Sequence, residues 1–251
     1  MEAGNTGRFD RLVEGTMVLV EYIALVVLGG AFAAVSAGMP SHGVELVPLV
    51  FWVLANMLGE VLWLPAPGKH GYLSMATTAN FAAILVLPTP LAIFVTAASG
   101  ALVDVLFRSR RWYQTLFNAA ATCAAVFTAS RVLTLAGQSP GDLAQLLSPL
   151  NVLAVGLAAA VYFFINTWLV SGVIALDQSL VACEVWSNTF ATRREVWGSL
   201  ILFLLGFLFA ILYLAWGYIS AFLISAAAYF VREAYRHYVT ASPAGAASGR
   251  D

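Results

Sequence analysis

Residues 102–120 read LVDVLFRSRRWYQTLFNAA, and their pattern fits two different classes of protein. An apolar run stops at Phe107, a short polar segment with three arginines follows, and a second apolar run begins directly after it. A soluble protein would use such a segment as a loop between two core helices. A membrane protein would place the arginines at the cytoplasmic end of two adjoining spans. The composition of the whole chain distinguishes the two.

The chain has 251 residues, of which 61% are hydrophobic and only 10% are charged, whereas soluble domains carry about 25% charged residues. A surface with so few charges is expected to face lipid. The net charge is −1 and Lys69 is the single lysine, so nucleic acid is not an expected partner. Cys123 and Cys183 form neither a disulfide framework nor a metal-binding motif.

The apolar segments predict an all-α, polytopic bundle of about eight transmembrane helices with both termini in the cytoplasm. The segments are 17–38, 45–64, 72–88, 90–107, 115–136, 150–176, 198–215 and 218–232. The domain is thus predicted over 17–238, after a cytoplasmic segment at 1–16 and before a disordered tail at 239–251. The break at Trp216-Gly217 is weak, which leaves open that 198–232 is one bent unit.

The charges support this topology, because every lysine and arginine except Arg131 falls on the side predicted to be cytoplasmic. We expect a multi-pass protein of the bacterial inner membrane. A cleavable signal peptide is the alternative for 17–37, but Glu21 interrupts its apolar run. The polar segment 177–197 is predicted to lie at the cytoplasmic interface, either as a flat helix or as a loop with interfacial aromatics.

The spans differ in composition, which predicts their places in the bundle. Spans four to six are rich in alanine and glycine, so their backbones can approach closely at the centre. Residues 200–214 consist mainly of leucine and phenylalanine, which predicts a helix that faces lipid.

Charged residues near the cytoplasmic span ends form the first group of candidate site residues. Acidic and basic side chains can cluster there, as helix-end ion pairs or as a site linked to protons or cations. The members are Glu21, Glu60, Asp104, Arg108, Arg110 and Arg111. Asp104 and Arg108 are four positions apart, so they meet if the helix continues. Such a pair is worth less than about 1 kcal/mol when exposed.

A second group of candidates lies deeper in the spans. Arg131 is the only basic residue in the outer half, and it either extends to the headgroups or faces the interior and binds an anionic group. Asn80, Asn166 and Thr77 are polar residues within apolar runs. They are expected to bond between helices or to line a ligand pocket together with Arg131.

No catalytic or cofactor chemistry is predicted from the residues. His42, His70 and His237 lie in connections or in the tail, so none is placed to ligate haem within the membrane. The sequence has no HExxH motif, and serine, histidine and acidic residues do not converge on facing spans. We therefore expect a protein that is not an enzyme and holds no cofactor or metal.

Residues 74–131 resemble the multi-span sensor region that precedes HD-GYP phosphodiesterase and GGDEF diguanylate cyclase domains in bacteria. The positions that carry the resemblance are Pro88, Gly100, Asp104, Arg111, Trp112, Tyr113, Phe117 and Asn118. The run Tyr162-Phe163-Phe164-Ile165-Asn166-Thr167 is similar to a later span of that region. The layout more distantly resembles the substrate-binding component of energy-coupling-factor transporters.

The resemblance implies a membrane sensor that binds a small or lipid-like ligand and signals through a cytoplasmic or membrane partner. A transporter component with a central pocket is one alternative, and a structural subunit of a larger membrane complex is another. The chain after Tyr238 is a short run of small residues, which predicts a linker. We expect any output to leave through a partner or through another part of a longer protein.

Overall fold

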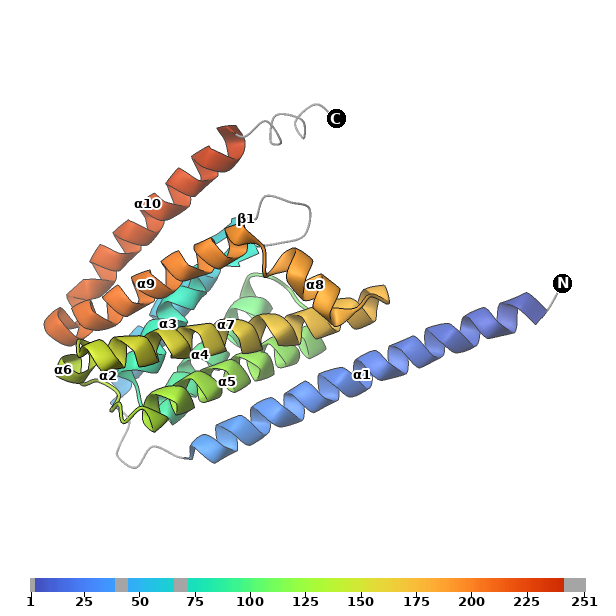
Figure 1. Cartoon of the computed structure of the whole chain (residues 1–251), viewed down its shortest axis with the longest axis horizontal. Coiled ribbons are helices and arrows are strands. Elements are labelled where there is room, and N and C mark those ends of the chain that lie inside the picture. Colours follow the sequence, from blue (N-terminus) through green and yellow to red (C-terminus); the bar gives the residue numbers. More distant parts are fainter. Residues whose placement is uncertain (1–2, 39–44, 66–71, 242–251) are drawn as a thin grey trace.

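The computed structural model describes residues 3–38, 45–65 and 72–241 (Figure 1). Within these ranges the chain is almost entirely helical, which confirms the all-α class. The helices are α1 (Ala3–Ala37), α2 (Leu46–Val61), α3 (Ala76–Val86), α4 (Thr89–Leu106), α5 (Trp112–Leu135), α6 (Leu143–Leu146), α7 (Pro149–Gln178), α8 (Ala182–Thr189), α9 (Arg193–Trp216) and α10 (Ser220–Ala241). A short hairpin of β1 (Trp63–Pro65) and β2 (Tyr72–Ser74) is the addition that the sequence did not predict.

The chain is a multi-pass membrane protein by the length and composition of its helices. Among the described residues, five helical stretches are long and apolar enough to cross a membrane, and α2 and α3 are shorter apolar helices. One of the five, Arg193–Ala227, is broken into α9 and α10 by a 3-10 turn at Gly217–Ile219. Each of the eight predicted segments therefore coincides with a helix. That all eight cross the membrane stays a prediction.

Helix α3 lies at the centre of the bundle. Every residue of α3 except Thr77 is buried, because α2, α4, α5 and α9 all pack around it. Helix α9 approaches it closely: a Cβ atom at Gly206 would lie 2.7 Å from the carbonyl oxygen of Thr78, and the Thr78 hydroxyl donates to Leu202 O at 3.2 Å. Residues 200–214 were expected to face lipid, and Leu204 and Leu208 are exposed on one face of α9, while the opposite face packs on α3 as part of the core.

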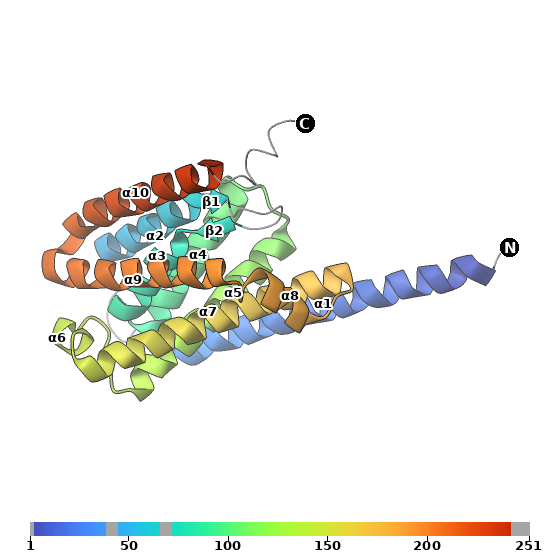
Figure 2. The same ribbon diagram turned by 45° about the horizontal axis from the view of Figure 1, so that its top comes forward.

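Helix α1 packs on α5 and α7 along a narrow face. A Cβ atom at Gly30 would lie 2.5 Å from Ala120 O, so only glycine permits this contact, and the Tyr22 hydroxyl donates to Leu169 O at 3.0 Å. The N-terminal part of α1 projects beyond the other helices (Figure 2). It does so at the end of the bundle that carries the α4–α5 connection, residues 107–111, which we call the arginine end.

Residues 179–192 fold back along α7. Ser179 takes a left-handed conformation with φ 55°, which ends α7, and α8 then returns beside α7 (Figure 1). The Trp186 indole donates to the Thr167 hydroxyl at 3.0 Å and its ring lies 6.1 Å from that of Trp168. The predicted interfacial segment thus contains one eight-residue helix that is attached to α7.

Candidate functional site

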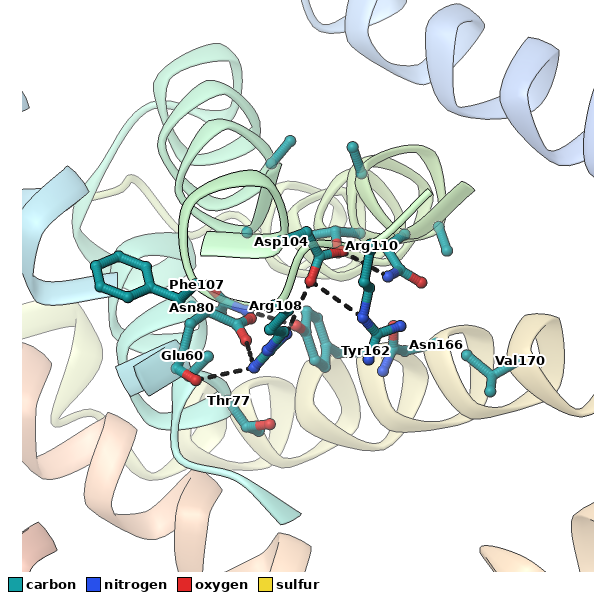
Figure 3. A pocket seen from close by; sticks show the side chains of 17 residues that line it. Glu60, Thr77, Asn80, Asp104, Phe107, Arg108, Arg110, Tyr162, Asn166 and Val170 are labelled. Carbon is teal, nitrogen blue, oxygen red and sulfur yellow. Dashed lines mark hydrogen bonds and ion pairs between the residues drawn. The ribbon is translucent and has the colours of Figure 1, made fainter. Parts of the chain in front are cut away.

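A polar cavity of about 560 Å³ lies in the half of the bundle nearest the arginine end (Figure 3). Its walls come from α2, α3, α4, α5, α7 and the α4–α5 connection. The polar residues that line it are Glu60, Thr77, Asn80, Asp104, Arg108, Arg110, Asn118, Thr122, Tyr162 and Asn166. Much of the remaining wall consists of alanine and glycine. Because these side chains on α4 and α5 are small, they leave the space of the cavity open.

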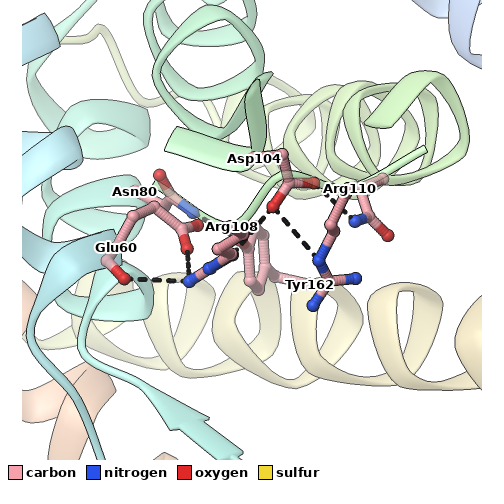
Figure 4. Close-up of polar contacts among 7 residues, drawn as sticks. Glu60, Asn80, Asp104, Arg108, Arg110 and Tyr162 are labelled. Atoms are coloured by element: carbon pink, nitrogen blue, oxygen red, sulfur yellow. Dashed lines mark hydrogen bonds and ion pairs between the residues drawn. The ribbon is translucent and has the colours of Figure 1, made fainter. Parts of the chain in front are cut away.

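Asp104 is the most deeply buried charged group of the cavity, with 1% of its surface exposed. One oxygen, Oδ1, accepts from Arg108 Nη1 at 3.0 Å and lies 3.4 Å from Arg110 Nε. The other, Oδ2, accepts from Asn118 Nδ2 at 2.8 Å (Figure 4). A buried carboxylate is tolerated only when it is paired and hydrogen-bonded, and these three donors meet that requirement.

Arg108 joins α2 to the end of α4. Its Nη2 donates at 2.8 Å both to Glu60 Oε2 and to the Glu60 backbone carbonyl, while Nη1 holds Asp104. The guanidinium therefore neutralises two carboxylates and satisfies a carbonyl in the last turn of α2, where a cation is favoured by the helix dipole. The predicted Asp104–Arg108 pair is confirmed, and it belongs to a partly buried network that also includes Glu60.

The α4–α5 connection is folded so that both arginines reach the cavity. The Phe107 and Arg108 amides donate to Val103 O, and the Arg110 amide donates to Asp104 O at 3.1 Å. Ser109 adopts φ 48° between them, a left-handed conformation that a residue with a Cβ atom rarely takes. This turn reverses the chain and directs the Arg108 and Arg110 side chains back over the polar lining.

A hydrogen bond between α3 and α7 forms the inner wall of the cavity. Asn80 Nδ2 donates to the Tyr162 hydroxyl at 3.1 Å, and both residues are buried. The Tyr162 ring packs edge-on against Phe203 of α9, with centroids 5.9 Å apart. Tyr162 was absent from the predicted site, although Tyr162 and Asn166 are four positions apart and so lie on one face of a helix.

Thr77 and Asn166 complete the lining, and their side chains form no hydrogen bond to any residue in the described ranges. Three of the four predicted ligand-binding candidates, Asn80, Asn166 and Thr77, are thus brought together in one cavity. Ligand binding by these residues stays a prediction. Within the described part of the chain, no group of three or more His, Cys, Asp or Glu side chains is placed to hold a metal ion.

Three predicted site residues lie outside the cavity. Arg131 is exposed, with its guanidinium 4.9 Å from the centre of the Phe127 ring and 3.5 Å from Ser36 O. The expectation that Arg131 faces the interior is therefore wrong, because its side chain lies exposed beside α1, where it reaches back over Phe127. Glu21 is exposed on α1, and Arg111 is exposed and donates to the Tyr113 hydroxyl at 3.1 Å.

Comparison with known proteins places the chain in a family. The sequence model of MASE9, a membrane-associated sensor domain, matches residues 16–232. No curated protein and no solved structure matches the chain. Because the family model covers most of its length, the chain belongs to the MASE9 family.

Proposed function

We propose that this MASE9 sensor domain binds a small polar molecule in the cavity at the arginine end and conveys its presence to a protein partner. Membrane-associated sensor domains are in general non-catalytic, and the chain is a member of such a family. The observation that carries the proposal is the cavity itself. Residues from five helices line it, and it contains Thr77 and Asn166, polar side chains that the described fold leaves without hydrogen bonds.

The arginine end is proposed to face the cytoplasm of a bacterium. Arg108, Arg110 and Arg111 lie at this end, and positively charged connections stay on the cytoplasmic side of a membrane. With this orientation the cavity is reached from the cytoplasmic side of the inner membrane. The ligand would then be a cytoplasmic solute or the headgroup of a lipid in the inner leaflet.

A route for the signal is suggested by the contacts of Arg108. This side chain ties Glu60 at the end of α2 to Asp104 near the end of α4, and Asn118 extends the network to α5. A ligand shifts a conformational equilibrium only through contacts that differ between the two states. We propose that a ligand in the cavity alters the Glu60–Arg108–Asp104 contacts and thereby moves the cytoplasmic ends of α2, α4 and α5.

The resemblance to regions that precede HD-GYP and GGDEF domains suggests an effector of cyclic-dinucleotide metabolism as the partner. Transport is the second candidate, since a transporter would also need a polar cavity. Transporter sites typically lie near the bilayer midplane. This cavity reaches Tyr162 near the middle of α7, but its charged lining residues, Glu60, Asp104, Arg108 and Arg110, all lie at the arginine end. We take the position of these charged groups at one end to favour sensing over transport.

The experiment is affinity purification from native membranes, followed by mass spectrometry of the bound proteins and small molecules. Gly100→Leu provides the test variant: a Cβ atom at Gly100 meets only Glu60 Oε1, at 3.9 Å, so a larger side chain can enter the cavity without a backbone clash. Gly29→Leu is the matched control, since a Cβ atom at Gly29 meets nothing within 4 Å.

We expect wild type and Gly29→Leu to retain a small molecule that Gly100→Leu loses. Retention of the same molecule by all three proteins would place its binding elsewhere and defeat the proposal. Co-purification of a transport ATPase in place of a signalling effector would favour the transporter.

A further inference from the structure

The carboxylates that line the cavity already have hydrogen-bonded oxygens. Asp104 Oδ1 accepts from Arg108 at 3.0 Å and pairs with Arg110 Nε at 3.4 Å, and Oδ2 accepts from Asn118 at 2.8 Å. Glu60 Oε2 accepts from Arg108 at 2.8 Å. A cationic ligand would have to displace an arginine from one of these groups. The acidic residues therefore hold the arginines in place and make a poor site for a cation.

The two arginines that line the cavity differ in how many of their guanidinium nitrogens have partners. Both terminal nitrogens of Arg108 are engaged, and its side chain is 20% exposed. Arg110 is 41% exposed and is held only through Nε. Its two terminal nitrogens have no hydrogen bond or ion pair to any described residue, and they point away from Asp104 towards α7 (Figure 4). These nitrogens are the uncommitted cationic donors of the cavity.

Neutral donors lie on the same side of the cavity. The side chains of Asn166 on α7 (Figure 3) and Thr122 on α5 line it. Neither side chain forms a hydrogen bond within the part of the chain that the structure describes. The Asn166 amide and the Thr122 hydroxyl can both donate. On the α2–α4 side, Glu60 Oε2 and both Asp104 oxygens are thus engaged, while the α5–α7 side offers side chains that can donate to a ligand.

The geometry points to a ligand that carries an oxyanion, a carboxylate or a phosphate group, bound by the terminal nitrogens of Arg110. A guanidinium binds two oxygens of such a group with two parallel hydrogen bonds. Asp104 holds Nε and so orients the plane of the guanidinium before the ligand arrives. This inference rests on the proposed function, because it assigns a chemical class to the ligand of the same cavity.

The charges of the cavity restrict the ligand further. Glu60 and Asp104 carry two negative charges and Arg108 and Arg110 two positive charges, so their formal sum is zero. One oxyanion group of low charge can pair with Arg110 under these conditions. A polyphosphate would bring several charges for which the cavity has no matching cation. The oxyanion can belong to a free cytoplasmic solute or to a lipid headgroup, since the site lies near the predicted membrane surface.

The test measures thermal unfolding of the purified protein in nanodiscs. In the first arm the discs contain only phosphatidylcholine, and inorganic phosphate or acetate is titrated at constant ionic strength. In the second arm these anions are omitted and phosphatidylglycerol is added to the discs. Wild type is compared with Arg110→Gln and Arg110→Lys. Arg111→Gln is the matched control, because Arg111 is the exposed neighbour that does not line the cavity.

A rise of the melting temperature in the first arm assigns a soluble oxyanion, and a rise only in the second assigns a lipid headgroup. We expect Arg110→Gln to weaken the apparent affinity roughly tenfold to a hundredfold, the effect of one or two charge-assisted hydrogen bonds. Arg110→Lys should weaken it as well, since lysine lacks the two-pronged geometry. Arg111→Gln should match wild type. No rise in either arm, or an equal rise in Arg110→Gln, overturns the inference.

Capture of the native molecule separates this inference from the proposed function. If Gly100→Leu loses that molecule while Arg110→Gln keeps it with unchanged affinity, the oxyanion assignment fails and the cavity remains the binding site. If Gly100→Leu and Arg110→Gln both keep it, the proposed function fails too.

Discussion

The two ends of the bundle are held together by different kinds of interaction. At the arginine end, Arg108 bonds to Glu60, a residue 48 positions away, and to the buried Asp104. At the opposite end, which we define as residues 136–151, the side-chain bonds are local and no lysine or arginine takes part. Gln138 Nε2 donates to Asn151 O at 2.9 Å, and Asn151 Nδ2 donates to Gln145 O at 2.7 Å.

This difference indicates which end is able to respond to a ligand. Local side-chain bonds fix the shape of one connection and join no two helices through an ion pair that a ligand could displace. The ionic network between α2 and α4 can change its contacts, because its arginines can pair with an anionic ligand instead. The arginine end therefore combines the cavity with contacts that are sensitive to what enters it.

Loss of Arg108 is expected to have the largest effect on stability. Arg108→Gln leaves Asp104, which is 1% exposed, and Glu60 without their shared cation, so the free energy of unfolding should fall by about 3 kcal/mol or more. Arg131→Gln is the control at an exposed arginine and should change it by less than about 0.5 kcal/mol. Denaturant titration in detergent measures both. Equal effects would mean that the contacts of Arg108 stabilise the fold no more than those of an exposed arginine.

Neutralising Asp104 is expected to have the next largest effect. Asp104→Asn keeps the shape but removes the charge that Arg108 and Arg110 share, which should destabilise the protein by about 2 kcal/mol. Asp142→Asn at the opposite end should cost less than about 0.5 kcal/mol, because asparagine also caps a helix, and Asp142 only accepts from the Gln145 amide. The same titration compares the two. An unchanged Asp104→Asn protein would contradict a charged network.

A smaller effect is expected from the neutral bonds. Asn151→Ala removes the donor to Gln145 O, a loss worth about 1 kcal/mol. The ligand-dependent rise in melting temperature should be unchanged in this variant, because Asn151 lies away from the cavity. A loss of ligand response in Asn151→Ala would show that the opposite end takes part in binding.

The smallest expected effect is a gain in stability. Ser109 has φ 48°, and glycine adopts this conformation without a steric penalty, so Ser109→Gly should raise stability by about 0.5 kcal/mol or leave it unchanged. A clear loss measured by thermal unfolding would mean that the Ser109 side chain makes a contact of its own.

The helices could be predicted from the sequence because apolar length and turn residues act locally. The eight apolar segments each became a helix, and the pairing of Asp104 with Arg108 followed from their spacing. The β1–β2 hairpin was not predictable from three-residue runs. The core position of α9 depended on Gly206, one small residue that meets α3, within a sequence typical of a lipid-facing helix.

The site was predicted only in part, because it depends on which helices become neighbours. Asn80, Asn166 and Thr77 were recognised as polar residues in apolar runs, but periodicity could not place them beside Arg108 and Arg110. Arg131 was chosen as the binding arginine because it stands alone in the outer half. That it is the only basic residue there does not determine which way its side chain points, and in the structure it lies exposed over Phe127 beside α1. The residue that turned out to be uncommitted inside the cavity, Arg110, was predicted only as part of a charge cluster.

The central claim is that the cavity is reached by water-soluble molecules from the cytoplasm, and thiol labelling tests it most directly. Gly100→Cys would be introduced after Cys123→Ser and Cys183→Ser remove the native thiols, with Gly29→Cys on α1 as the lipid-facing control. In inside-out vesicles, a membrane-impermeant maleimide should label Gly100→Cys but not Gly29→Cys, and in right-side-out vesicles it should label neither. Labelling of Gly100→Cys only from the outside, or from neither side, would contradict the account.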